Sequence, residues 1–137
     1  NFCDIIKEMK KESEKEYVAW IRQMYDKYKS ILFIEKYHLK VEKDNDKDPV
    51  YLGCKFNYPY LDAKILWSDE SFKNWQNDKD NKNSERRIIH EFCHIITDPL
   101  YAVVLDFPSK KQIENERERL TDHIAQIVNK HFTGLSK

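Results

Sequence analysis

The segment that decides the fold is His90-Glu91-Phe92-Cys93-His94. It has the form His-Glu-x-x-His, with two histidines four positions apart. Residues at this spacing share one face of an α-helix, so both imidazoles would point the same way and could hold one metal ion. Glu91 lies one step round the helix, within reach of a metal-bound water but outside the ligand positions, which is the placement of a general base. The segment therefore predicts a metal site on a helix.

The neighbouring residues divide this expected helix into two faces. At about 100° per residue, His90, His94 and Glu91 lie within roughly 100° of one another. The apolar back is formed by Ile88, Ile89, Phe92, Ile95 and Ile96. Cys93 falls between the two faces, and we expect it to be a small buried residue rather than a nucleophile or ligand. The alternative is a pair of surface histidines on an ordinary amphipathic helix.

A catalytic zinc site needs a third protein ligand and keeps a fourth position for water. The downstream candidates are Glu114, Glu116 and Glu118. We favour Glu118, because it shares a helix face with the small residues Thr121 and Ala125, which would let that face approach the first helix closely. Glu116 stays open as the rival ligand. Asp122, one turn after Glu118, could accept a hydrogen bond from the far nitrogen of a metal-binding histidine.

The pairing of the His-Glu-x-x-His segment with a downstream Glu118-x-x-Thr121-Asp122 resembles the gluzincin metallopeptidases, the family of thermolysin. Many members carry Glu-x-x-Ser/Thr-Asp on their ligand helix. The resemblance covers residues 63–128 and implies a minimal, single-domain relative of that catalytic core. It also implies a zincin-like order of elements, with a strand before the active helix and the ligand helix after it.

The resemblance assigns a role to each residue of the two motifs. The metal ligands that it implies are His90, His94 and Glu118. Glu91 would be the general base, and Asp122 the partner of one histidine. The implied cofactor is Zn²⁺, although a site of two nitrogens and one oxygen also accepts other divalent ions. Larger members stabilise the oxyanion with a Tyr or His from a further subdomain, and the nearest candidates here are Tyr101, His123 and His131.

The function implied is hydrolysis of peptide bonds in a peptide or protein substrate. An extended substrate could pair with an exposed sheet edge, for which 63–67 is the candidate strand, although a covered central position is an equal alternative. The functional alternative is a non-catalytic zinc-binding regulatory or interaction domain. Glu91 favours the enzyme, because structural zinc needs no such carboxylate and has four protein ligands.

Composition excludes several other classes of protein. The 137 residues predict one domain, and 40% hydrophobic with 13% aromatic residues is too apolar for a disordered chain. Two glycines, far apart, exclude the glycine-rich nucleotide-binding loops. The 24 basic and 24 acidic residues balance, and no unopposed basic run is present, so we expect no nucleic-acid or membrane partner, although an average charge of zero leaves a local basic patch open. Three cysteines without a Cys-x-x-Cys pair favour a reducing, cytoplasmic compartment; the chain starts at Asn1 rather than Met, which leaves a removed signal segment open.

Hydrophobic periodicity predicts an α+β fold. The expected helices span 2–28, 69–76, 84–96 and 109–132, and the expected strands span 31–42, 50–58 and 63–67. We expect a small, mainly antiparallel sheet in which the first two strands form a hairpin. Ser84 is the predicted N-cap of the active helix, Asp98-Pro99 its end, and Gly134 the stop after the last helix. His38, His123 and His131 are expected to be structural or surface residues.

Overall fold

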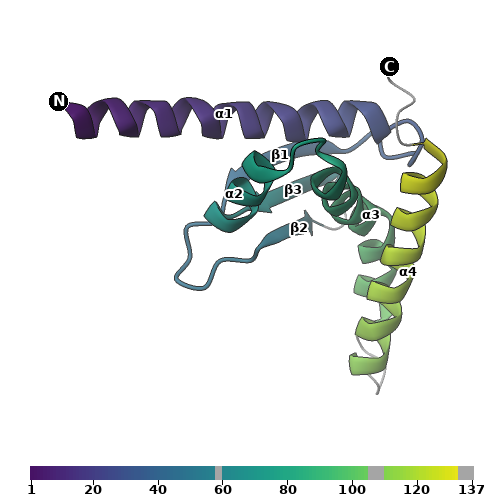
Figure 1. Ribbon diagram of the computed structural model, residues 1–137. Helices are drawn as coiled ribbons and strands as arrows, with labels where there is room; N and C mark the ends of the chain where they lie inside the picture. The colour runs from purple at the N-terminus through teal and green to yellow at the C-terminus, as the bar shows by residue number, and fades with distance from the viewer. Residues whose placement is uncertain (58–59, 105–109, 133–137) are drawn as a thin grey trace.

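The computed structural model describes residues 1–57, 60–104 and 110–132. Within these residues the fold is α+β, with four helices and one mixed three-stranded sheet (Figure 1). The elements in chain order are α1 (Phe2–Tyr28), β1 (His38–Lys43), β2 (Leu52–Asn57), β3 (Asp62–Trp67), α2 (Asp69–Asn77), α3 (Lys82–Val104) and α4 (Lys110–Phe132). The predicted stop at Gly134 lies outside the described residues.

The sheet has the order β1-β3-β2 and is mixed, which corrects both the predicted hairpin and the prediction of a mainly antiparallel sheet. β1 pairs with β3 in parallel, and β2 pairs with β3 antiparallel, so the first two strands do not touch as partners. β3 is central because it is the most apolar strand: Ala63, Ile65, Leu66 and Trp67 are all buried. The expectation that 63–67 forms an exposed edge is therefore wrong, and its alternative, a covered central strand, is confirmed.

The first strand is much shorter than predicted. The segment before it turns at Phe33, whose φ of 57° is left-handed and incompatible with a strand. The hydroxyl of Tyr25 on α1 lies 2.8 and 2.9 Å from the carbonyl oxygens of Ile34 and Tyr37 and shares its one proton between them. These bonds hold the segment in its turn, so regular pairing starts only at His38, whose side chain is exposed as expected.

An aromatic cluster joins α1 to the sheet and α2. Its members are Tyr17, Trp20, Trp67, Phe72 and Trp75, and the ring centroids of its contacting pairs lie 5.1 to 6.2 Å apart. α1 matches its predicted span and runs well beyond the sheet in Figure 1. Its first turns carry exposed apolar side chains, Phe2, Ile5, Ile6 and Met9. Only its second half is part of the core.

The helix that carries His-Glu-x-x-His is longer than predicted at both ends. α3 begins at Lys82, so Ser84 is not its N-cap but a first-turn residue, whose N–H donates to Oδ2 of Asp78 at 2.8 Å. Pro99 lies inside the helix, which continues to Val104. The turn beyond Pro99 places Tyr101 against Arg117 of α4.

The apolar back of α3 is buried as expected. Ile88, Ile89, Phe92 and Ile95 are at most 1% exposed, whereas Ile96, also predicted to be buried, is 40% exposed. This burial leaves the front of the helix facing α4. No described helix has both the length and the apolar character that crossing a bilayer requires.

Candidate metal centre

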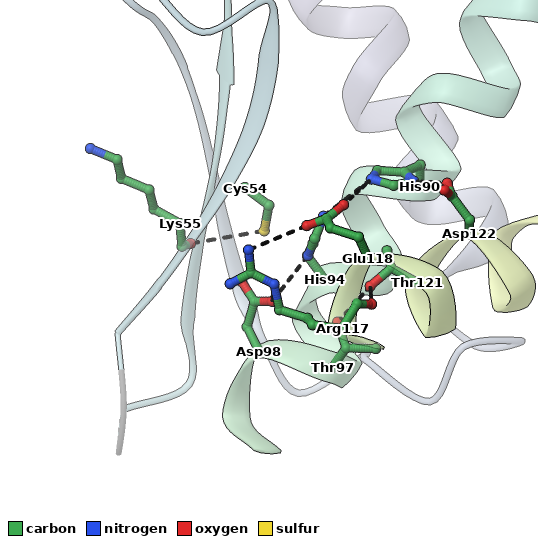
Figure 2. Close-up of polar contacts among 10 residues, drawn as sticks. All are labelled: Cys54, Lys55, His90, His94, Thr97, Asp98, Arg117, Glu118, Thr121 and Asp122. Atoms are coloured by element: carbon green, nitrogen blue, oxygen red, sulfur yellow. Dashed lines mark hydrogen bonds and ion pairs between the residues drawn. The ribbon is translucent and has the colours of Figure 1, made fainter. Parts of the chain in front are cut away.

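Three predicted ligands converge between α3 and α4. His90 and His94 point from α3 toward Glu118 on α4 (Figure 2), and one ligand atom from each lies within 4.8 Å of the others. The two Nε2 atoms are 3.2 Å apart. Nε2 of His90 lies 3.5 Å from one Glu118 carboxylate oxygen, and Nε2 of His94 lies 3.6 Å from the other. Two histidines and one carboxylate thus face a common point.

Each histidine has a carboxylate on its far nitrogen. Nδ1 of His90 lies 2.6 Å from Oδ1 of Asp122, the partner expected from the sequence. Nδ1 of His94 lies 3.0 Å from Oδ1 of Asp98, which sequence reasoning missed. A carboxylate accepts a hydrogen bond, so both Nδ1 atoms are the protonated ones and both Nε2 lone pairs face Glu118. The i, i+4 spacing of His94 and Asp98 was the signal that could have found Asp98.

This arrangement is electrostatically unbalanced. Two Nε2 lone pairs and a carboxylate repel one another at these separations unless a proton or a cation lies among them. Burial lowers the pKa of His94, but the hydrogen bond and charge of Asp98, with the charges of Glu91 and Glu118, outweigh burial and raise its pKa. The side chain of His94 is buried, while those of His90 and Glu118 are partly open to solvent. The centre favours positive charge.

Glu91 lies beside this centre in a cleft of about 370 Å³ that His90 and Asp122 also line. Burial raises the pKa of Glu91 to about 8, and the negative charges of Glu118, Asp98 and Asp122 add to the rise while His94 opposes it. A bound dication would lower the pKa of a neighbouring carboxyl. The predicted general base is thus next to the predicted ligands, and it is not one of them.

Arg117 is a second residue that sequence reasoning missed. Its Nη2 donates to Oε1 of Glu118 at 3.2 Å, and its Nε lies 3.9 Å from Oδ1 of Asp98 (Figure 2). Its guanidinium also lies over the ring of Tyr101, 4.1 Å from the centroid. Arg117 thus places one positive charge between the predicted ligand Glu118 and Asp98, the carboxylate that orients the predicted ligand His94. Its position next to Glu118 in the sequence was the only signal.

The face of α4 that carries the small residues Thr121 and Ala125 lies close to α3, as expected. Thr121 is fully buried, and its hydroxyl donates to the carbonyl oxygen of Arg117 at 2.7 Å. The hydroxyl oxygens of Thr97 and Thr121 lie 2.9 Å apart, so Thr97 is the donor of that pair. Ala125 is buried one turn later. These contacts set the distance between the helices that carry the ligands.

The remaining candidates lie outside the centre. The hydroxyl of Tyr101 donates a hydrogen bond to Oε1 of Glu114 at 2.7 Å, so these two side chains are bonded to each other. His123 and His131 are exposed, as expected. The side chain of Glu116, the rival ligand, lies outside the described residues. Cys93 is 0% exposed and burial raises the pKa of its thiol to about 12, which confirms a structural residue.

Comparison of the chain with protein-family models, with curated proteins and with solved structures found no match. The case for a function therefore depends on the geometry of the centre alone.

Proposed function

We propose that the protein is a zinc-dependent metallopeptidase of zincin-like fold, with His90, His94 and Glu118 as metal ligands. The observation that carries this proposal is the spacing of the ligand atoms. Ligands about 2.1 Å from a tetrahedral zinc lie about 3.4 Å from one another. The three separations here are 3.2, 3.5 and 3.6 Å. Three protein ligands of this type leave a fourth position open, as in catalytic zinc sites.

The chain's own groups support metal binding in the correct protonation state. Asp122 and Asp98 accept hydrogen bonds from the Nδ1 atoms, which keeps both Nε2 lone pairs available. Arg117 holds one oxygen of Glu118 and restricts the rotation of that carboxylate. When bound, zinc would supply a Lewis acid that activates water and polarises a carbonyl group.

Glu91 is the residue to which we assign proton transfer. It lies in the cleft, next to the ligands but free of them, where its carboxylate would take a proton from the attacking water and return it to the leaving amine. A non-catalytic zinc domain would have no use for this half-buried carboxylate in the cleft. Its position is what favours an enzyme over the binding domain.

The substrate, a peptide or protein, would bind along β2. β2 is an edge strand among the described residues, pairing with β3 on one side, and it lies next to α3. An extended peptide could add to its open edge through backbone hydrogen bonds. This assignment replaces the strand 63–67, which is covered on both sides.

The test is metal content followed by hydrolysis. Elemental mass spectrometry should find about one zinc per chain in the parent and in Glu91→Gln, and none in His94→Ala or Glu118→Ala. Glu114→Ala is the matched control, because it removes the same group one turn earlier on α4 and should keep the metal. The parent should then cleave a randomised peptide library at least about a hundredfold faster than Glu91→Gln.

Two results would contradict the proposal in different ways. If the parent takes up no metal when zinc is supplied, the proposed metal site is wrong, and the proposed function with it. A parent that binds one zinc but cleaves no peptide faster than Glu91→Gln would leave a non-catalytic zinc-binding domain.

A further inference from the structure

The cleft beside Glu91 extends past the metal centre to a pair of arginines. Arg86 and Arg87 line it together with His90 and Glu91 of the same helix. They precede His90 by four and three positions, so they lie on the same side of α3, about 4.5 to 6 Å further along its axis. A strand advances about 3.3 Å per residue, so this offset corresponds to about two residues of an extended peptide.

One of these arginines has fixed partners, and the other has no ion-pair partner among the residues that the structure describes. Arg87 donates to the hydroxyl oxygen of Tyr51 at 2.6 Å, and its guanidinium lies 5.3 Å from the centroid of that ring. Asn74 donates to the same hydroxyl at 2.8 Å, so Tyr51 forms a fixed wall of the cleft. Arg86 is exposed and forms no ion pair within the described part of the chain.

Two acidic side chains line the cleft, Glu91 and Asp122, and neither forms an ion pair with Arg86 among the described residues. Asp122 is hydrogen-bonded to His90. The wall formed by Tyr51 and Leu52 carries no charge. A planar guanidinium binds a carboxylate through two parallel hydrogen bonds, and such pairs are among the stronger polar contacts in proteins. The end of the cleft is therefore suited to a carboxylate.

We propose that Arg86, supported by Arg87, binds a carboxylate of the substrate within about two residues of the bond that is cleaved. This inference rests on the proposed function and assigns its substrate class. The carboxylate has two possible sources, an acidic side chain or the free carboxyl terminus of the substrate. Either source would make the protein selective for acidic peptides or for chain ends.

The test uses hydroxamates, which bind zinc directly and are not cleaved. One pair is N-acetyl-glutamyl hydroxamate and its glutaminyl counterpart, which probe an acidic side chain. The other pair is the monohydroxamate of succinic acid and its amide, which probe a terminal carboxylate. Isothermal titration of the zinc-loaded chain should show one acid binding roughly ten- to a hundredfold more tightly than its matched amide. The pair that shows the preference identifies the source.

Variants separate this inference from the metal site. Arg86→Gln, at an exposed position, should reduce the preference to about twofold or less, without changing binding of the amide probes. Lys82→Gln is the matched control, because it removes a positive charge from α3 one turn earlier, outside the cleft, and should keep the preference. Equal binding of acid and amide in both pairs would overturn this inference alone. Failure of all four probes to bind a chain that holds one zinc would show that the metal has no open position, which would overturn the proposed catalytic function and this inference with it.

Discussion

The aromatic cluster and the α3–α4 interface hold the molecule together by different means. The cluster packs five large rings between α1, β3 and α2. The interface instead places imidazoles, carboxylates and two threonine hydroxyls between two helices. Apolar burial stabilises the folded chain without any ligand, whereas converging lone pairs and carboxylates do so only when a cation or proton balances them. Stability and metal binding should therefore be separable by mutation.

The largest expected effect is in the cluster. Phe72 is 5% exposed and touches the rings of Tyr17, Trp67 and Trp75. Phe72→Ala should lower the free energy of unfolding by about 3–5 kcal/mol, because it removes buried surface and leaves a cavity. Urea unfolding of the metal-free chain measures the loss.

The matched control for Phe72→Ala is Phe2→Ala, whose side chain is 76% exposed and which should change stability little. Zinc affinity of folded Phe72→Ala should equal that of the parent. A large loss of affinity would show that the two regions are coupled.

A second prediction concerns the polar group inside the cluster. Burial raises the pKa of Tyr17 to about 12 from its usual 10. The folded state therefore keeps the proton that the unfolded chain loses above pH 10, so this stability is present below pH 10 and is lost between pH 10 and 12. The loss should be about 2–3 kcal/mol at pH 12.

Tyr17→Phe should remove this loss, and Tyr60→Phe, at an exposed tyrosine, should not. Unfolding by urea at a series of pH values from 8 to about 12 compares the three chains. Parallel curves for the parent and Tyr17→Phe would show that the alkaline loss has another origin.

The smallest expected effect is in the interface. Asp98→Asn keeps the shape of the side chain but removes the charge that orients His94, so zinc affinity should fall about 10- to 100-fold. Competition with a chromophoric chelator measures it, and Asp80→Asn, at an exposed turn, is the control. Stability of the metal-free chain should stay within about 1 kcal/mol of the parent. A variant with full zinc affinity would exclude Asp98 from the centre.

The type and order of the helices and strands could be predicted, whereas several of their bounds and the pairing of the strands could not. The apolar spacing in residues 2–28 is a property of a single helix, and the predicted bounds of that helix match α1. The order β1-β3-β2 depends on which strand the helices bury, and alternation within a strand does not reveal that. Local sequence rules predict that a helix ends at Pro99. α3 nevertheless continues beyond Pro99, where it contacts α4, a segment distant in sequence.

The site residues that could be predicted are those that lie four positions apart on one helix. His90, His94, Glu118 and Asp122 come together because the i, i+4 relation is fixed by helix geometry and because Thr121 lets the helices approach. Asp98 and Arg117 were missed. The role of Arg117 depends on α3 and α4 lying side by side, and no pattern within α4 encodes that.

α1 is one continuous helix whose first turns are exposed to solvent and whose second half packs against the core. The amides of its first turns are held by the helix's own hydrogen bonds, while those after Tyr17 lie over the core. Helical segments shorter than about 12–15 residues are marginal in water, and opening within a core requires far more free energy than fraying at an end. In deuterated solvent the two halves of α1 should therefore exchange their amide hydrogens on widely separated timescales, with the change in rate near Tyr17.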